Sequence, residues 1–404
     1  MGKNNYGMGN IVNEFAVKLV KFIFRLYYSF LSFAFRVNKK KVVIATYRDS
    51  ELNDNFKSIY KSLSEGTDVE VVLRFRKMNS GLKERFIYVV HLLSSLYHVA
   101  TCRVLLLDDY YFPLYLINKR SETKVIQIWH ACGAFKKFGY SIVGKKSGPS
   151  PEYLKLVPVH SNYDYAIVSS KEAVLPFAEA FNMSPEQILP IGVPRTDFFF
   201  SKEEKESVKN KFYQKFPHLK SKIKILYAPT YRGAAHNQKD QNLILDREKL
   251  FKYIQPEKYE VLIKLHPYLE NEYTVDQTYT EQFSLYELMI VSDVLITDYS
   301  SVIFEYSLLN KPILFYCPDF DNYMEERDFY FPFDSFAPGP ITKNLSSLVK
   351  ELKYLNSDPQ KVNLKEFSKR FMENCDGRST DRVVSLILGM LTDNDEKRRV
   401  NIEV

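Results

Sequence analysis

Short runs of β-branched residues alternate with longer amphipathic stretches through most of this 404-residue chain. Such alternation is typical of parallel sheets covered by helices. The pattern therefore predicts an α/β fold with two Rossmann-like halves. The predicted strands are residues 41–46, 69–75, 104–108, 124–129 and 165–169, and then 223–228, 259–265, 293–297 and 312–316. The predicted helices include residues 82–99, 171–182 and 300–310, and the tail 345–391.

A charged segment, residues 202–222, separates the two halves and is expected to contain a helix. The length is sufficient for two domains with separate cores, which argues against a single small binding module. We therefore expect an amino-terminal helix over residues 1–40, one domain over 41–205 and a second over 206–404.

The charge balance argues against a nucleic-acid partner. A net charge of +7 is modest for this length, and no zinc-finger or RNA-recognition pattern occurs. The four cysteines are far apart without metal-ligand spacing, which predicts reduced thiols in the cytoplasm.

Residues 11–37 combine high apolar content with polar residues that recur every three or four positions. At about 100° per residue these form one narrow stripe, opposite a wide aromatic face. This pattern predicts a helix lying on an anionic membrane surface, and Lys39, Lys40 and Lys41 follow directly. A helix packed on the protein's own core is the alternative, whereas the interrupting charges disfavour a transmembrane span. The stripe consists of Glu14, Lys18, Lys21, Arg25, Ser29, Ser32 and Arg36.

His130 follows the predicted strand 124–129 and precedes Gly133, Lys136 and Lys137. An imidazole can take a proton from a hydroxyl near neutral pH, and glycine lets the backbone approach a phosphate. Ligands of parallel sheets bind beyond the carboxyl ends of the strands, which makes His130 a candidate base. A purely structural histidine remains the alternative.

A second histidine, His266, ends the predicted strand 259–265 in the other half, after Lys264 and before a proline. Beside a lysine, it could stabilise the charge of a transferring phosphoryl group. A histidine that only bonds a loop carbonyl is an equally good reading of this motif alone. Arg232 follows the strand 223–228, where its guanidinium could pair with a phosphate or simply face solvent.

The segment from Thr297 to Ser301 joins a predicted buried strand to a helix. Ser300 or Ser301 could cap this helix, whose free amides would then cradle a pyrophosphate, and Glu305 could reach a ribose hydroxyl. Ordinary capping is the alternative for the serines. Asp298 and Glu305 form only a weak metal pair because no third ligand is evident, so no metal site is expected.

Taken in chain order, these motifs resemble the CDP-glycerol:poly(glycerophosphate) glycerophosphotransferase family of teichoic acid synthesis over roughly residues 100–385. The segments that carry the resemblance are residues 127–130 with 136–139, 192–197, 227–232, 264–267, 293–301, 310–316 and 338–340 with 376–378. Family members often have Trp-His-Gly-Thr-Pro where this chain has Trp129-His130-Ala131-Cys132-Gly133. That departure is closer to the primase and ribitol-phosphate branches.

The resemblance implies a GT-B-like pair of domains around a central cleft. It implies attack by an acceptor hydroxyl on the phosphorus that bears the polyol, with CMP leaving and no bound cofactor. His130 would be the base and His266 would steady the phosphoryl group. Arg232, Lys264, Thr297, Asp298, Ser300, Ser301 and Glu305 would hold the CDP part, and Gly133, Lys136 and Lys137 would contact acceptor or phosphate.

The expected donor is CDP-glycerol or CDP-ribitol, and the expected acceptor is an undecaprenyl-linked saccharide or polyol phosphate. The enzyme would work as a peripheral protein on the cytoplasmic face of the cell membrane. Without the long extra regions of some polymerases, it would add one unit or a short run of units. A GT-B glycosyltransferase that uses a nucleotide sugar and a catalytically silent scaffold remain as alternatives.

Overall fold

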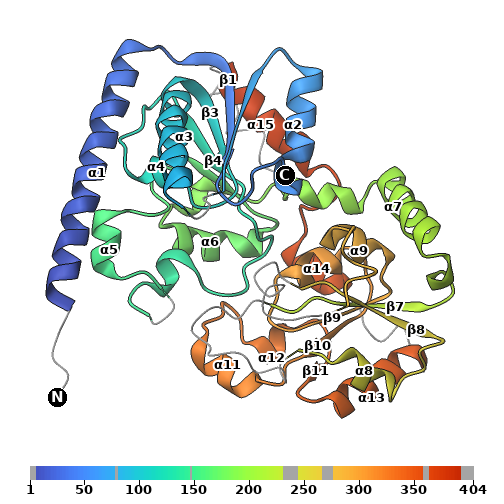
Figure 1. Cartoon of the computed structure of the whole chain (residues 1–404). Helices are drawn as coiled ribbons and strands as arrows, with labels where there is room; N and C mark the ends of the chain where they lie inside the picture. Colours follow the sequence, from blue (N-terminus) through green and yellow to red (C-terminus); the bar gives the residue numbers. More distant parts are fainter. Residues whose placement is uncertain are drawn as a thin grey trace, which may run out of the picture. The chain divides into compact units, whose positions relative to one another are not determined.

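The computed structural model describes residues 6–77, 81–145, 148–230, 244–265, 276–357 and 364–392. The chain divides into two compact units (Figure 1). The first contains residues 1–131, 137–195 and 374–404, and the second contains residues 132–136 and 196–373. Each is built on one parallel sheet, which confirms the predicted α/β class.

The sheet of the first unit has the strand order β2-β1-β3-β4-β5-β6, and every pairing is parallel. Its core is formed by apolar side chains from β1, β3 and β4 together with those of helices on the sheet faces. The strands are β1 (Asn38–Thr46), β2 (Glu70–Phe75), β3 (Cys102–Leu107), β4 (Lys124–Gln127), β5 (Tyr165–Ile167) and β6 (Ile188–Leu189). The helices are α1 (Tyr6–Ala34), α2 (Asp54–Gly66), α3 (Leu82–Thr101), α4 (Phe112–Tyr115), α5 (Pro151–Leu156), α6 (Val174–Phe181) and α15 (Ser379–Leu391).

The sheet of the second unit has the order β11-β10-β9-β7-β8 and is also parallel. Its strands are β7 (Ile223–Tyr227), β8 (Tyr259–Ile263), β9 (Val294–Thr297), β10 (Ile313–Tyr316) and β11 (Ile341–Thr342). Its helices are α7 (Lys202–Lys215), α8 (Arg247–Phe251), α9 (Leu285–Val291), α10 (Val302–Ser307), α11 (Phe320–Glu326), α12 (Phe333–Phe336), α13 (Leu345–Ser357) and α14 (Lys365–Phe371).

Each sheet has one topological switch point, where the order of the strands along the chain reverses its direction across the sheet. In the first sheet the chain proceeds from β1 to β2 on one side and from β3 to β6 on the other, so the switch lies between β1 and β3. In the second sheet the switch lies between β7 and β9. Ligands of open α/β sheets bind beyond the strand ends at such switch points.

The two units differ from the expected domains 41–205 and 206–404 in three places. Residues 132–136 and 196–205 belong to the second unit, and the carboxyl-terminal segment with helix α15 belongs to the first. Val383, Ile387 and Met390 of α15 lie in the same apolar core as side chains of β1 and β3. Figure 1 shows α15 beside α2, although the two helices are far apart in the sequence. Gly192 supports this arrangement, because it has φ of 87° and an added Cβ would overlap the backbone of Asn374.

The amino-terminal helix α1 is docked on the first unit through Phe24, Tyr28 and Leu31, which are buried. The Tyr28 hydroxyl accepts a hydrogen bond from the backbone amide of Arg120 at 3.2 Å, and Arg120 also donates to the carbonyl of Ser32. Packing on the protein's own core therefore occupies one face of α1. No helix in the described part of the chain combines the length and apolarity needed to cross a bilayer.

Candidate active site

His130 lies just beyond the end of β4, beside the switch point of the first sheet, where it contacts the two residues that follow β3. The preceding residue, Trp129, has φ of 51°, a left-handed conformation that non-glycine residues seldom adopt. The amide of Trp129 donates to the Gln127 side-chain oxygen at 2.9 Å, and its ring stacks on Phe138. This strained turn is thus held from both sides, which fixes the direction of the His130 side chain.

The environment of the imidazole determines which nitrogen carries its hydrogen. Nδ1 of His130 lies 3.3 Å from the backbone oxygen of Asp108 and 3.3 Å from Oδ2 of Asp109. A carbonyl oxygen can only accept, so these partners place the hydrogen on Nδ1. Nε2 is therefore the nitrogen with the free lone pair. About a third of the His130 side chain is exposed, so a substrate hydroxyl can approach it.

The charge states of His130 and Asp109 suit a base at neutral pH. Burial, together with the nearby guanidinium groups of Arg48 and Arg195, holds the pKa of His130 well below its ordinary value. Burial raises the pKa of Asp109 to about 7, although Arg48 lies 3.4 Å from its carboxylate. The imidazole is consequently neutral near pH 7, where Asp109 is about half ionised.

Side chains from two further segments hold the ends of β3 and β4. Oδ2 of Asp108 accepts hydrogen bonds from the side-chain amides of Asn53 and Asn55, at 2.9 and 3.0 Å. Arg195 donates to the Asn55 side chain at 2.6 Å and to the backbone oxygen of His130 at 3.2 Å. Asn53 is also the N-cap of α2. The start of α2 and the segment after β6 therefore brace the candidate base.

The second predicted cluster lies at the switch point of the second sheet. Oδ1 of Asp298 accepts a hydrogen bond from the amide of Thr230 at 2.8 Å, and Thr297 donates to the backbone oxygen of Ala228 at 2.7 Å. These bonds tie the end of β9 to the end of β7. Lys264 follows β8, and its ammonium group donates to the carbonyl of Thr280 at 3.3 Å.

The two serines do not form a strong cap. Ser301 is the N-cap of α10 but makes no side-chain cap bond, and Ser300 accepts only a long bond from the amide of Val302 at 3.4 Å. Since α10 has six residues, its dipole is also small. The expectation of a capped helix that binds pyrophosphate is therefore weakened, whereas the position of both serines at the switch point is kept.

Glu305 is 4% exposed, and its Oε1 lies 3.3 Å from the thiol of Cys132. The carboxylate thus bonds to the segment that follows His130, within the second unit. The expected contact of Glu305 with a ribose hydroxyl stays a prediction.

Gly133 and Lys136 both lie against aromatic rings of the second unit. A Cβ at Gly133 would overlap the ring of Phe304 on α10, so the glycine is needed for ring packing, a role not anticipated from the sequence. The Lys136 ammonium lies 5.5 Å from the ring centre of Tyr323, which stacks on Tyr299 at 3.7 Å. Lys137 is half-buried in the first unit. Lys136 is thereby associated with Tyr299 of the second predicted cluster.

Two predicted residues, Arg232 and His266, lie outside the described residues. Within the described ranges, no group of three or more histidine, cysteine, aspartate or glutamate side chains is arranged to hold a metal ion.

The sequence reasoning missed Asp109, Arg48 and the bracing residues Asp108 and Asn55. One signal for the two carboxylates was available, because Asp108 and Asp109 directly follow the apolar run 104–107. Two adjacent acids at the end of a buried strand are typical of a site rather than of a core. Arg48 and Asn55 lie in polar stretches of the sequence, which carry no such signal.

Two parallel α/β units, each with a polar cluster at its switch point, define a GT-B-like transferase. The family model described as CDP-Glycerol:Poly(glycerophosphate) glycerophosphotransferase matches residues 26–389. The chain belongs to this family. It is accordingly a polyol-phosphate transferase of teichoic acid synthesis, as the sequence motifs predicted.

Curated relatives and solved structures agree with this assignment. A teichoic acid ribitol-phosphate primase of Bacillus spizizenii is 52% identical over 388 residues, which cover 94% of this chain and 99% of that protein. A poly(ribitol-phosphate) polymerase of the same species is 36% identical over 94% of this chain and 61% of its own length. The solved structure of the wall teichoic acid polymerase TagF matches with a TM-score of 0.72 and 25% identity, and the match covers 95% of this chain and 99% of that one.

Proposed function

We propose that this enzyme transfers ribitol phosphate from CDP-ribitol to a hydroxyl of a lipid-linked acceptor and releases CMP. The observation that carries the proposal is the 52% identity to a ribitol-phosphate primase over 99% of its length. The similarity to a primase favours one addition or a short run of additions over synthesis of a long polymer.

In the proposed reaction, the acceptor oxygen attacks the phosphorus that bears the ribitol. A new phosphorus–oxygen bond forms while the bond to the phosphate oxygen of CMP breaks, and CMP leaves. Nε2 of His130 accepts the proton of the attacking hydroxyl. The support for this role is the neutral imidazole, whose Nδ1 hydrogen is directed to Asp108 and Asp109.

We assign the CDP part of the donor to the strand ends of the second sheet. The support is topological, because Thr297 and Asp298 lie at the end of β9, which borders the switch point, and Lys264 follows β8 on the other side of β7. In the sequence, Ser300 and Ser301 follow β9 and Arg232 follows β7. His266 is assigned to the transferring phosphoryl group by family resemblance. The buried contact between Glu305 and Cys132 favours a positioning role for this carboxylate.

We further propose that the enzyme is peripheral on the cytoplasmic face of the membrane, where an undecaprenyl-linked acceptor would be available. The support is the outer face of α1, on which large apolar side chains are exposed. This face would lie in the boundary between headgroups and acyl chains.

The test is to incubate the full chain with a lipid-linked acceptor and each of CDP-ribitol, CDP-glycerol and a panel of nucleotide sugars, and to measure nucleotide release. We expect CMP release from CDP-ribitol to be at least about tenfold faster than from CDP-glycerol. A preference for CDP-glycerol would overturn the assignment of ribitol. Turnover of a nucleotide sugar alone would instead support a glycosyltransferase.

A further inference from the structure

Helix α1 carries three parallel faces. Phe24, Tyr28 and Leu31 face the protein and are buried. A second apolar face is exposed, and Phe33 at its end has 93% of its surface accessible. By helical geometry, the polar stripe that contains Lys18, Lys21 and Arg25 falls between the two apolar faces. The exposed apolar face consists of Phe15, Leu19, Phe22, Ile23, Leu26, Phe30 and Phe33.

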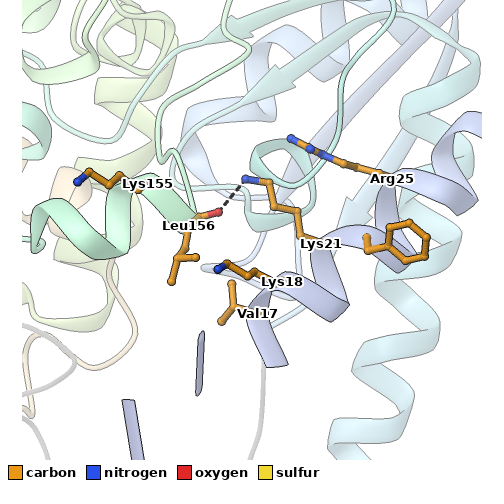
Figure 2. Close-up of a pocket in the computed structure, with 7 residues that line it drawn as sticks. Val17, Lys18, Lys21, Arg25, Lys155 and Leu156 are labelled. Atoms are coloured by element: carbon orange, nitrogen blue, oxygen red, sulfur yellow. Dashed lines mark hydrogen bonds between the residues drawn. The ribbon is translucent and has the colours of Figure 1, made fainter. Parts of the chain in front are cut away.

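A pocket of about 290 Å³ lies between this polar stripe and α5 (Figure 2). Four of its seven lining residues are cations, and none is acidic. The lining residues are Val17, Lys18, Lys21, Phe22, Arg25, Lys155 and Leu156. Such a concentration of one sign of charge creates a site for an anion.

Two of the cations are held in place by backbone carbonyls. Lys21 donates to the oxygen of Leu156 at 2.8 Å, as Figure 2 shows, and Arg25 donates to the oxygen of Leu116 at 3.2 Å. Carbonyl oxygens fix these side chains without neutralising their charge. Among these four cations, Lys18 is the one with a carboxylate partner in the part of the chain that the structure describes, Glu14 at 2.6 Å. The pocket therefore retains a positive charge that is fixed to the protein.

We infer that this pocket binds the phosphate of an anionic membrane lipid, whose acyl chains lie against the exposed apolar face of α1. The inference rests on the proposed membrane attachment and adds a defined headgroup site to it. Phe22 belongs to both the pocket lining and the exposed apolar face, so a molecule with a phosphate next to an acyl chain matches both surfaces. A free phosphate ion would satisfy only the cations.

The site differs from a diffuse attraction between basic residues and a membrane. Lys155 lies on α5, outside the membrane-facing helix, and contributes to the pocket through its exposed side chain. Because α1 is docked on the first unit, a lipid bound there would fix the orientation of this unit relative to the bilayer.

The test measures partitioning of the full chain onto sedimented vesicles of phosphatidylglycerol and phosphatidylcholine, compared with pure phosphatidylcholine. Lys155→Gln should weaken binding to the anionic vesicles about fivefold, the effect of one well-placed cation. The matched control is Lys61→Gln, which removes an exposed lysine from α2 and should change binding less than twofold. A second variant, Lys18→Glu, should weaken binding more strongly, and its exposed position leaves the fold intact.

Equal losses in the Lys155 and Lys61 variants would overturn the inference, because they would indicate a diffuse charge effect. Equal binding of the wild type to pure phosphatidylcholine would do the same. Inorganic phosphate at about 10 mM, compared with chloride at equal ionic strength, should not displace the protein from vesicles, and displacement would show that free phosphate is the ligand. CMP release with a soluble acceptor analogue should be unchanged in the Lys155 variant, which separates this site from the proposed transfer reaction.

Discussion

The two switch points of this enzyme share one topology but differ in what occupies them. At the first, His130 and Arg48 both contact the carboxylate of Asp109, and the pKa values of His130 and Asp109 are shifted. At the second, Thr297 and Asp298 bond to the backbone at the end of β7. The first site therefore contains groups that can move a proton, whereas the described side chains of the second stabilise the geometry of the strand ends.

This difference supports the proposed roles of the two sheets, with proton transfer at the first and donor binding at the second. Proton transfer needs a titratable group with a controlled pKa, which the first sheet supplies. Holding a nucleotide diphosphate needs rigid backbone and fixed donors, which the second sheet is suited to supply. Variants of the first site should therefore change turnover, and variants of the second should change donor affinity or stability.

The largest expected effect comes from His130→Ala. If His130 is the base, the variant should bind the donor normally and lose about 10²–10⁴ in kcat. If His266 stabilises the transferring phosphoryl group, His266→Ala should lose a comparable factor in kcat and also weaken donor binding, because a ground-state phosphate would already feel that contact. The double variant should be little worse than the poorer single variant, since both groups act on one transition state.

The measurements are single-turnover CMP release and calorimetric donor binding. His218→Ala is a suitable control because His218 is exposed on the second unit and should leave turnover unchanged. Near-normal turnover in His130→Ala would show that His130 is not the base. The acceptor hydroxyl would then lose its proton to the substrate itself or to water.

The next effect is on donor affinity. Arg232→Ala should weaken binding of the CDP donor by about 1.5–3 kcal/mol, the range for a hydrogen bond to a charged group. Turnover at saturating donor should change much less than in the His130 variant. The exposed Arg85 of α3 offers a control, since Arg85→Ala removes the same charge from the first unit. Unchanged affinity in calorimetry would exclude Arg232 from the donor site.

Much of the fold, and the position of His130 within it, could be predicted from the sequence. The nine strands expected from β-branched runs are all present, and His130 lies at the end of its strand as expected. These predictions succeeded because burial in a parallel sheet demands continuous apolar runs, and strand ends follow directly from them. The two-residue strands β6 and β11 were missed because they are too short to show a pattern.

Contacts between distant segments were not predictable in the same way. The bond between Cys132 and Glu305 joins residues 173 positions apart, and α15 returns to the first sheet from the end of the described chain. The faces of α1 were also only partly predicted. Its periodicity defined one polar stripe, but the division of its apolar surface into a buried and an exposed face depends on where the protein packs.

A change in residues 132–136, the short segment of the second unit that follows His130 in the sequence, should affect stability rather than chemistry. Gly133→Ala places a methyl group against the ring of Phe304. Overpacking of this kind costs about 1–3 kcal/mol of unfolding free energy. Gly66→Ala is the matched control, because no atom lies within 4 Å of its added Cβ. Denaturant unfolding should distinguish the two, and equal stability would show that the Phe304 ring moves aside without cost.

The smallest expected rate effect tests whether Asp109 positions the imidazole of His130 or has a structural role alone. Asp109→Asn keeps the shape of the side chain but removes the charge that faces Nδ1 of His130. Loss of one charge-assisted hydrogen bond should lower kcat about tenfold at pH 8, which corresponds to roughly 1.4 kcal/mol.

The pH profile of kcat is the sharper measurement. In the wild type, activity should fall as pH drops through about 7, because a protonated Asp109 no longer offers a carboxylate to the Nδ1 hydrogen. In the variant this step should disappear, and the remaining acid limb should lie well below pH 6.5, where the lowered pKa of His130 places its own protonation. Asp49→Asn should keep the wild-type profile, because Asp49 accepts a hydrogen bond from the side chain of Asn53 and does not contact the His130 imidazole among the described residues. A profile with the step near pH 7 retained in Asp109→Asn would assign that titration to another group and leave Asp109 with a structural role alone.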